Sequence, residues 1–202
     1  MLTLYHSPRS RSTRVVALLH ELNALDAVAV ERVAIPRQDG SGQRDPHNPH
    51  PEGKVPFLVH DGVAVRESSA IMLHLADLFP EAGLNIPPGH PQRGAYLGWF
   101  AWYAGVVEPV MVLEAVGLSH PALAATFRDG AAMRQRLREA LAEGPFLFGA
   151  QFTAADLLLH SPYAWFGKPG DPVLAAWVDR CMSRPGARFA LEFDAEAQTP
   201  SA

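Results

Sequence analysis

Cysteine is nearly absent from this chain, and its absence excludes several classes of protein. Cys181 is the single cysteine among 202 residues, so an internal disulfide, a CxxC redox pair and a cysteine-based zinc site are excluded. Basic residues are also few, since 17 Lys and Arg against 21 Asp and Glu give a formal net charge of −4. That balance provides no global positive field, which argues against nucleic acid as the main partner.

Long hydrophobic runs are missing as well. No uninterrupted apolar run approaches the ~20 residues that a membrane-spanning helix needs. The opening residues MLTLYHSPRS turn polar early, so no signal peptide is visible. Hydrophobic residues still make up 48% of the chain, inside the globular range. We therefore expect a soluble, cytoplasmic protein with an ordinary core in one large or two small domains.

The N-terminal part of the chain predicts a small α/β domain over residues 1–79. Its first elements are a strand at 2–5, a helix from Ser10 or Ser12 to about Leu22, and a strand at 27–33. A strand-helix-strand unit favours a parallel pair of strands joined by a crossover helix. Residues 35–52 then hold four prolines and two glycines without apolar periodicity, which predicts a long connection that contains at most one helical turn.

Residues 53–72 predict a β-hairpin followed by a helix. Two apolar runs, 57–59 and 63–65, flank His60-Asp61-Gly62, and Asp-Gly between such runs is a strong hairpin signal. The helix after Glu67 is expected to begin at a capping serine and to run from Ser68 to about Leu78. Its N-terminus offers free N–H groups to a carboxylate or phosphate, so this segment predicts a small-anion receptor.

Beyond a linker at 80–90, which is rich in helix-breaking residues, residues 91–202 predict an all-helical domain. A long helix is expected there, with kinks at Gly105 and Pro109. Six apolar or aromatic residues fall on one face of it: Tyr96, Trp99, Tyr103, Val106, Val110 and Leu113. Thr153 and Asp156 have the spacing of a capping box. Further helices are expected at about 121–142, 172–182 and 186–191, followed by a frayed tail, AEAQTPSA.

Three segments together resemble the cytosolic glutathione transferases, over nearly the whole chain. They are LTLYHSPRSRSTRVVALLHELN, NPHPEGKVPFLVHDGVAVRESSAIMLHLADLFP and FLFGAQFTAADLLLHSPYAW. The middle segment is the most specific, because a VP before the hairpin and an ES at the next helix occur together. The resemblance implies a serine-type, bacterial-like member with a thioredoxin-like N-terminal domain (β-α-β, loop, β-β-α), an all-helical C-terminal domain and a homodimeric state. It leaves the subclass unassigned.

The resemblance also implies a site for the tripeptide glutathione. In such proteins the bond before the Pro56 equivalent is cis, and the main chain at Val55 pairs with the cysteinyl backbone. Glu67 and Ser68 match the positions that hold the γ-glutamyl end, where the helix N-terminus and the Ser68 hydroxyl suit a carboxylate and Glu67 suits an ammonium. The candidates for the glycyl carboxylate are Lys54, Arg37 and His50.

The expected chemistry requires a thiolate, because a free thiol with a pKa of ~8.5 is mostly protonated at neutral pH. A hydroxyl donor at a helix N-terminus favours the anion, and family members use a Tyr, Ser or Cys near the start of the first helix. Tyr5 lies too early, and no cysteine is near. An alignment anchored on Arg14 and Val15 selects Ser10, whereas an alignment anchored on Pro8 selects Arg11 and Ser12.

We favour Ser10 as the thiol contact, with Ser12 second, and expect at least one of the two to be only a helix N-cap. Arg9, Arg11 and Arg14 are cations in a first helical turn, where they oppose the helix dipole by ~0.3–1 kcal/mol each when exposed. Their presence suggests an anionic ligand nearby. Arg11 is our candidate for adding positive potential at the thiolate.

The second substrate is expected to be apolar. Two or three of seven side chains are expected to line its pocket, since aromatic residues at helical spacing are more often core: Trp99, Trp102, Tyr103, Val107, Met111, Trp165 and Phe166. His47 and His50 with Asp45 have loose metal-ligand chemistry, but a solvated loop explains them better, so no metal is expected.

The leading hypothesis is a detoxifying transferase that activates glutathione and conjugates it to an apolar electrophile. Two alternatives stay open. One is another glutathione reaction, such as isomerisation, dehalogenation or peroxide reduction. The other is a non-catalytic binding or scaffold protein that keeps the fold. The sequence does not name the electrophile.

Overall fold

The computed structural model describes residues 1–196, and its contacts divide the chain into two compact units. Unit 1 contains Met1–Ala82 and the C-terminal segment that begins at Arg184, whereas unit 2 contains Gly83–Ser183. The predicted domain limits, with an N-terminal domain at 1–79, a linker at 80–90 and a helical domain at 91–202, remain a prediction. By its contacts, however, the last helix belongs with the N-terminal unit.

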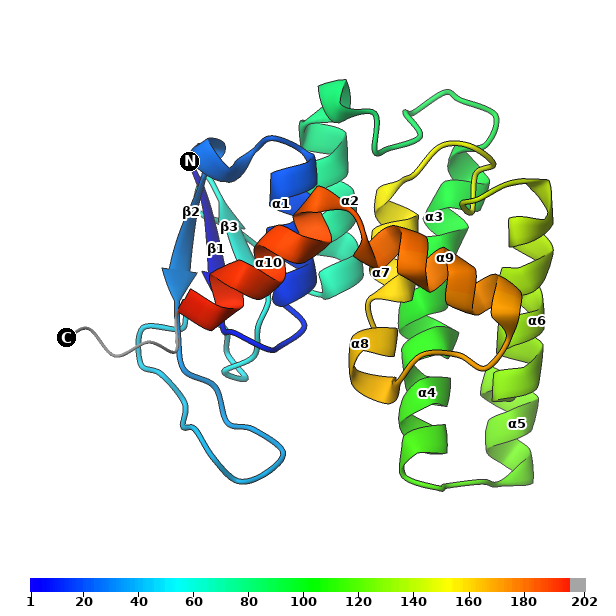
Figure 1. The fold of residues 1–202 in the computed structure, drawn as a ribbon. Coiled ribbons are helices and arrows are strands. Elements are labelled where there is room, and N and C mark those ends of the chain that lie inside the picture. Colours follow the sequence, from blue (N-terminus) through cyan, green and yellow to red (C-terminus); the bar gives the residue numbers. More distant parts are fainter. Residues whose placement is uncertain (197–202) are drawn as a thin grey trace. The chain divides into compact units, whose positions relative to one another are not determined.

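Unit 1 contains a four-stranded mixed sheet with the strand order β2-β1-β3-β4 (Figure 1). Strand β1 pairs in parallel with β2 and antiparallel with β3, and β3 pairs antiparallel with β4. The predicted β-α-β, loop, β-β-α order is confirmed. The strands are β1 (Leu2–His6), β2 (Val28–Arg32), β3 (Phe57–His60) and β4 (Val63–Val65), and the helices α1 (Thr13–Glu21) and α2 (Ser68–Leu78), with 3-10 turns at Leu25–Ala27 and Pro80–Ala82.

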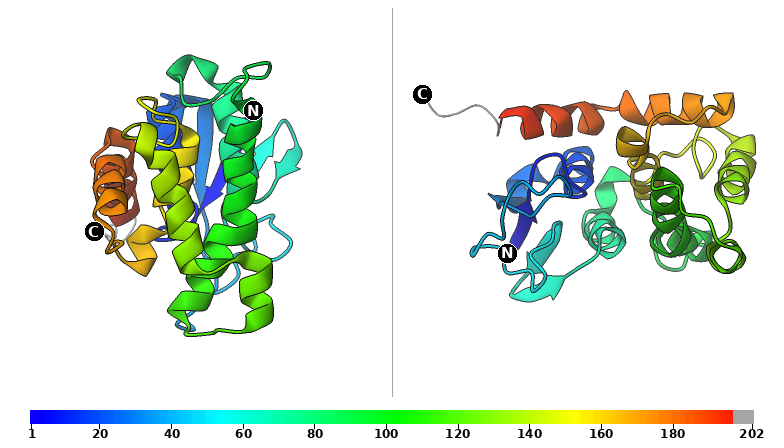
Figure 2. Two further views of the ribbon diagram at one scale, coloured as in Figure 1. Left: turned by 90° about the vertical axis from the view of Figure 1, so that its right-hand side faces the viewer. Right: turned by 90° about the horizontal axis from the view of Figure 1, so that it is seen from below.

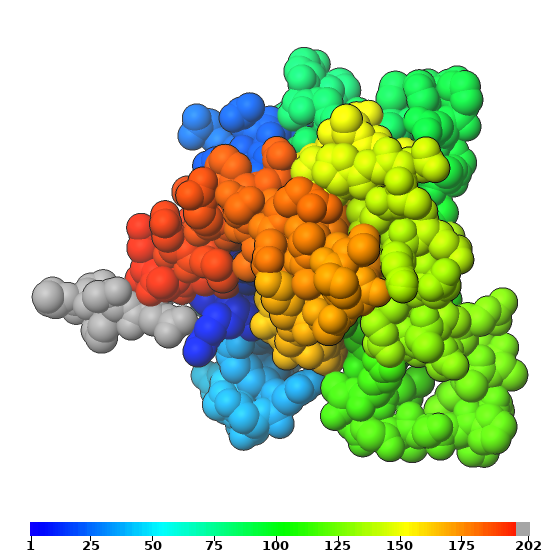
Figure 3. Space-filling view, turned by 45° about the vertical axis from the view of Figure 1, so that its right-hand side comes forward, coloured from blue at the N-terminus to red at the C-terminus, as the bar shows by residue number. Residues whose placement is uncertain are grey.

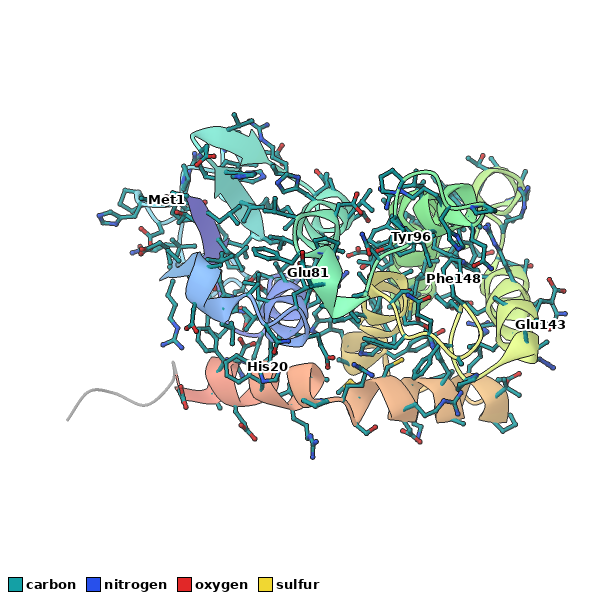
Figure 4. All side chains as sticks on the ribbon, turned by 90° about the horizontal axis from the view of Figure 1, so that it is seen from above. Met1, His20, Glu81, Tyr96, Glu143 and Phe148 are labelled. Atoms are coloured by element: carbon teal, nitrogen blue, oxygen red, sulfur yellow. The ribbon has the colours of Figure 1, made fainter. Side chains whose placement is uncertain are left out.

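Helix α10 (Pro185–Glu196) packs along α1 inside unit 1, as the right-hand view in Figure 2 shows. Gly186 permits this approach, because a Cβ at that position would lie 2.5 Å from the carbonyl oxygen of Ala17. The ring of His20, labelled in Figure 4, packs against the ring of Phe189 of α10 with 4.7 Å between centroids and a tilt of 33°. The face of α10 that is turned away from α1 is open to solvent in the space-filling view of Figure 3.

The C-terminal helix is longer than the predicted 186–191. Of the predicted frayed tail, Ala195 and Glu196 belong to α10, and residues 197–202 lie outside the described part of the chain.

Unit 2 is mostly helical, as predicted. Helices α3, η3 and α4 form one long stretch from Arg93 to Ala115 (Figure 2). The described elements are α3 (Arg93–Trp102), η3 (Tyr103–Val107), α4 (Glu108–Ala115), α5 (Pro121–Phe127), α6 (Gly130–Ala140), η4 (Leu141–Glu143), α7 (Ala154–His160), α8 (Tyr163–Phe166) and α9 (Pro172–Met182). In Figure 4, Tyr96 and Phe148 lie close together, with 5.9 Å between their ring centroids.

The predicted irregularity around Gly105 and Pro109 is a π-helical segment, Tyr103–Val107. Proline inside a regular α-helix collides with the carbonyl four residues earlier. The wider π turn lies directly before Pro109, which occupies the first turn of α4, so the helix continues without that collision.

The predicted single helix over 121–142 is wrong, because the chain breaks between α5 and α6. Arg128 has a φ of 74°, which an α-helix does not permit. The side chain of Asp129 then accepts a hydrogen bond from the amide of Ala132 at 2.8 Å and caps α6. An aspartate followed by glycine was the local signal for this break.

The stretch Arg93–Ala115 has a mean hydropathy of 1.2 over its most apolar window and is long enough to cross a membrane. No segment long and apolar enough to cross a membrane was predicted from the sequence. In the protein, 39% of that window is buried, and core helices of soluble proteins meet the same criterion. It is the one candidate within residues 1–196 and is weak evidence for a membrane span.

Candidate functional site

The strand register brings three segments of unit 1 to one edge of the sheet. Tyr5 at the end of β1 pairs with Phe57 at the start of β3, and Leu58 pairs with Val65 at the end of β4. Because β3 runs antiparallel to both neighbours, the residues after β1, before β3 and after β4 all lie at this edge. These are residues 7–12, the Val55–Pro56 pair, and residues 66–68.

Three serines between β1 and α1, namely Ser7, Ser10 and Ser12, form what we call the hydroxyl cluster. Ser10 Oγ lies 2.6 Å from the carbonyl oxygen of Ser7 and 2.8 Å from Ser12 Oγ, and it accepts from the Ser12 amide at 3.1 Å. Ser12 Oγ also accepts from the Ser7 amide at 3.1 Å. Ser12 is fully buried and Ser10 half-buried, so the structure brings both predicted hydroxyls together but exposes only Ser10.

Ser12 occupies the N-cap position of α1, yet its side chain caps nothing. Its hydroxyl instead contacts the ring of a buried histidine, His6, which was not predicted from the sequence as part of the site. His6 Nδ1 lies 2.7 Å from Ser12 Oγ, and His6 Nε2 lies 3.1 Å from Asp194 Oδ1 of α10. His6 is completely buried and Asp194 nearly so.

Asp194 anchors the other end of this arrangement. Its Oδ2 accepts from the Arg9 amide at 2.6 Å and from Thr13 Oγ1 at 2.7 Å. Burial alone would raise the pKa of Asp194, but the hydrogen bonds from His6, Thr13 and the Arg9 amide outweigh it and hold that pKa below its usual value. Asp194 is therefore a carboxylate at neutral pH.

Two of the predicted cations have clear places in this region. The guanidinium of Arg37 donates to the carbonyl of Pro8 at 2.9 Å and to Ser7 Oγ at 3.3 Å, so it holds the loop that carries the hydroxyl cluster. Arg14, for which a solvent-facing role was one expectation, is only 3% exposed. Arg11 is exposed, and its role at the thiolate stays a prediction.

The Val55–Pro56 peptide bond is cis, and both residues are buried. Lys54 is exposed, and its carbonyl accepts from Asn48 Nδ2 at 3.2 Å. His50 is buried, with its Nδ1 accepting from the Glu52 amide at 3.0 Å. The structure thus gives His50 a role within the loop and adds Asn48, which the sequence reading missed, as a support of the segment before β3.

Helix α2 begins at Ser68, but the predicted serine cap is wrong. The N-cap position is Glu67, with φ 68° and ψ 128°, and no side chain caps the helix. Positive φ is uncommon outside glycine, and such strain of order 1 kcal/mol clusters at functional sites. Glu67 is exposed and Ser68 half-buried, so the first turn of α2 keeps its uncapped amide groups beside an exposed carboxylate.

The candidates for a second-substrate pocket lie in unit 2 and have different surroundings. The guanidinium of Arg136 lies over the rings of Trp99 and Trp102, at 4.9 and 4.3 Å from their centroids. Tyr103 and Val107 are buried in the π-helical segment, whereas Trp165 is 42% exposed. Whether any of them faces the thiol stays a prediction, as it does for Met111 and Phe166.

A hollow of about 310 Å³ in unit 2 lies elsewhere, between α4, α5 and the start of α6. Val110, Leu113, Leu118 and Leu123 are among its lining residues, and none of the seven candidates for the second-substrate pocket is. Among residues 1–196 no group of three or more His, Cys, Asp or Glu side chains is placed to hold a metal ion. The His47–Asp45 pair is a 3.1 Å surface contact with His47 exposed.

Comparisons with known proteins agree with this fold. A model of the glutathione S-transferase N-terminal domain matches residues 4–83. The chain is 26% identical over 219 residues to glutathione S-transferase 3 of Schizosaccharomyces pombe, covering 95% of this chain and 87% of that protein. It is 28% identical over 152 residues to glutathione S-transferase GstA of Escherichia coli O157:H7, covering 70% and 74%. A sphingomonad glutathione S-transferase solved in complex with glutathione matches with a TM-score of 0.75 and 27% identity, covering 96% of this chain and 98% of that one.

The sheet topology and these matches define the class: a thioredoxin-like domain followed by a mostly helical region. These matches support a relationship to the cytosolic glutathione transferase family.

Proposed function

We propose that this protein binds glutathione at the sheet edge of unit 1 and transfers it, as the thiolate, to an apolar electrophile. The observation that carries the proposal is the strand register. It brings the hydroxyl cluster, the buried cis Val55–Pro56 pair and the strained, uncapped start of α2 to the same edge. Those three features match the three chemical groups of the tripeptide: thiol, peptide backbone and γ-glutamyl terminus.

The γ-glutamyl end is assigned to the start of α2. Its carboxylate meets the open amide groups and the Ser68 hydroxyl, where the helix dipole favours an anion. Its ammonium meets the exposed carboxylate of Glu67. The main chain at Val55 takes the cysteinyl backbone. For the glycyl carboxylate, exposed Lys54 is a better candidate than Arg37 or His50, because the loop already occupies Arg37 and buries His50.

Ser10 is assigned to the thiol. Ser12 Oγ is buried and surrounded by His6, Ser7 and Ser10, whereas Ser10 is partly open to solvent. A hydroxyl that donates to sulfur stabilises the thiolate and lowers the thiol pKa. Arg11 adds positive potential nearby. A bound-thiol pKa that does not change in Arg11→Ala would argue against that last role.

Calorimetric titration with glutathione tests the binding half of the proposal. Glu67→Gln removes the carboxylate that pairs with the ligand ammonium, and we expect about tenfold weaker binding, equivalent to ~1.4 kcal/mol. Glu139→Gln, at an exposed glutamate of α6, is the matched control and should bind like the wild type. Equal affinity for the wild type and Glu67→Gln would remove the assignment at α2.

Turnover of a chromogenic aryl halide tests the catalytic half. Ser10→Ala should lower kcat by at least tenfold while glutathione still binds, because the thiolate loses its donor. A wild type that binds glutathione without turning over the aryl halide would favour another glutathione reaction or a non-catalytic role. A wild type that does not bind glutathione would favour a scaffold that has lost its ligand.

We further propose that the protein is a cytoplasmic homodimer with a role in detoxification, as the family resemblance implies. Light scattering after size-exclusion chromatography tests the oligomeric state directly. A mass near the 21.9 kDa of the single chain would contradict the dimer.

A further inference from the structure

The loop between β1 and α1 takes a left-handed turn immediately before Ser10. Arg9 has a φ of 51°, a conformation that residues other than glycine adopt rarely and that persists where surrounding contacts hold it. The peptide units on either side of this turn determine where Ser10 begins and in which direction its hydroxyl points. The contacts that hold Arg9 and the main chain of Ser10 therefore also position the proposed thiol contact.

Asp194 of α10 holds this turn from one side, through its amide groups. Asp194 Oδ2 accepts from the Arg9 amide at 2.6 Å and from Thr13 Oγ1 at 2.7 Å. Thr13 Oγ1 in turn accepts from the Ser10 amide at 3.3 Å. One carboxylate oxygen thus holds two consecutive amides, that of Arg9 directly and that of Ser10 through the Thr13 hydroxyl. Hydrogen bonds to a charged acceptor are stronger than neutral ones, so this side of the turn is firmly held.

Arg37 holds the same turn from the other side, through its carbonyl groups. One terminal nitrogen of its guanidinium donates to the carbonyl of Arg9 at 3.4 Å. The other donates to the carbonyl of Pro8 at 2.9 Å and to Ser7 Oγ at 3.3 Å. The planar fork of a guanidinium reaches several acceptors at once in a fixed geometry, whereas the ammonium of a lysine is a single point of contact. Arg37 therefore restrains three consecutive residues of the loop.

The main chain of Arg37 is itself fixed by a closed turn in the long connection. Its amide donates to the carbonyl of Ser41 at 2.9 Å, and its carbonyl accepts from the Gly40 amide at 3.1 Å. The carboxylate of Asp39 accepts from the amide and the hydroxyl of Ser41, at 2.9 and 2.6 Å. The half-buried side chain of Arg37 thus extends from a defined turn, which allows it to hold the neighbouring loop in place.

We propose that Arg37 and Asp194 are positioning residues, which hold the left-handed turn at Arg9 from two sides and so fix the direction in which Ser10 presents its hydroxyl. Both residues act through the loop, and no proton moves through them. All of these groups belong to unit 1. The inference deepens the proposed function and rests on it for the identity of the group that Ser10 contacts.

Amide hydrogen exchange, followed by NMR in the ligand-free protein, tests the positioning without any use of glutathione. The Arg9 and Ser10 amides should exchange at least tenfold faster in Asp194→Ala and in Arg37→Lys, relative to the amides of Leu18 and Leu19 inside α1. Taking the ratio to α1 separates release of the turn from a general loss of stability. A ratio in both variants equal to that of the wild type would overturn the proposal, whatever the protein binds.

Turnover of the aryl halide by Arg37→Lys separates positioning from charge and from direct binding of the ligand. The ammonium keeps the positive charge but not the three contacts. We therefore expect kcat to fall about fivefold and the pKa of bound glutathione, read from thiolate absorbance, to rise by about 0.7 units. KM for glutathione should change less than about twofold. A wild-type kcat would overturn the role, because charge alone would then suffice, and a loss confined to KM would overturn it in favour of direct binding.

Thr13 provides a matched pair of variants on the Asp194 side. Thr13→Val removes the hydroxyl that joins the Ser10 amide to Asp194, and kcat should fall about fivefold. Thr13→Ser keeps that hydroxyl and should recover at least half of the wild-type kcat. A Thr13→Ser variant as slow as Thr13→Val would overturn the proposed link, because the loss would then follow from the missing methyl group.

Arg188→Lys, at an exposed arginine of α10, is the control for the arginine replacement and should match the wild type in exchange, kcat and bound-thiol pKa. A failure of the proposed function appears separately, as a wild type that does not bind glutathione. In that case the exchange ratios of the ligand-free protein still decide whether Arg37 and Asp194 hold the turn.

Discussion

Asp156 is the acceptor that joins three elements of unit 2, and its replacement gives the sharpest stability test in this chain. Its Oδ1 accepts from the Leu147 amide at 2.9 Å and from Trp177 Nε1 at 3.1 Å. Its Oδ2 accepts from the amide and the hydroxyl of Thr153, both at 3.0 Å, which completes the predicted capping box of α7. Burial raises the pKa of Asp156 above its ordinary value, and these hydrogen bonds offset that rise only in part.

Asp156→Ala removes all four contacts from a site with 0% exposure. The Thr153 hydroxyl can rotate to another acceptor, but the three N–H groups cannot. A buried donor left without a partner costs ~1–3 kcal/mol, so the three together give about 3–9 kcal/mol before relaxation. Because relaxation recovers part of this, we expect a loss of about 4 kcal/mol, a large fraction of a typical ~5–15 kcal/mol stability. Asp156→Asn keeps one oxygen and should lose about half as much.

Urea unfolding followed by far-ultraviolet circular dichroism and by tryptophan fluorescence measures this loss. Trp177 is itself one of the donors, so its emission reports on the site directly. Asp179→Asn is the control, because its carboxylate is exposed and paired with Lys168 at the surface of α9, and surface ion pairs contribute little. A change below about 1 kcal/mol in Asp156→Ala would refute the reasoning, since it would mean that three buried N–H groups find other partners at no cost.

Three further predictions follow from unit 1. The folded-state pKa of Asp194 is lowered, so its contribution to stability is present above the unfolded pKa of ~3.9 and is lost as pH falls through the folded value; Asp194→Asn should flatten that acid limb in a Tm-against-pH profile. Gly186→Ala should lower urea stability by about 1–3 kcal/mol, because its Cβ would meet the Ala17 carbonyl, whereas Gly98→Ala, with no atom within 4 Å, should be neutral or gain up to ~1 kcal/mol. Glu67→Gly should raise the melting temperature by relieving the positive φ and weaken glutathione binding, so a variant that does neither would contradict both roles of Glu67.

Local sequence signals predicted the parts of this protein that depend on local geometry. Asp61-Gly62 marked the hairpin turn, and both residues have positive φ. The limits of α2, Ser68–Leu78, agree with the prediction, as does the capping box at Thr153. In each case a few adjacent residues determine the conformation, so the pattern carries the information.

Other features depend on which of two local signals prevails, or on contacts between residues far apart in the sequence. The local sequence gave little or no indication of them. Apolar periodicity continues past Arg128 and hid the break that Asp129 creates. Ser68 has the chemistry of a cap, but the backbone turn at Glu67 leaves it inside the helix. Asp194 meets the Arg9 amide across 185 positions of the chain. No local pattern predicts a contact over such a distance in the sequence. For the same reason the sequence did not indicate His6, whose contact with Asp194 also joins the two ends of the chain.

The return of α10 to unit 1 has a consequence for biosynthesis. The strands, the hydroxyl cluster and α2 all leave the ribosome before unit 2 is made, whereas Asp194 follows it. During translation His6 is therefore without its carboxylate partner, and α1 without the helix that covers it, until unit 2 has been synthesised. A nascent or prematurely terminated chain that stops before Arg184 contains every residue of the proposed ligand contacts but lacks Asp194. The contacts of Asp194 with His6, the Arg9 amide and Thr13 can therefore form only after unit 2 has been synthesised.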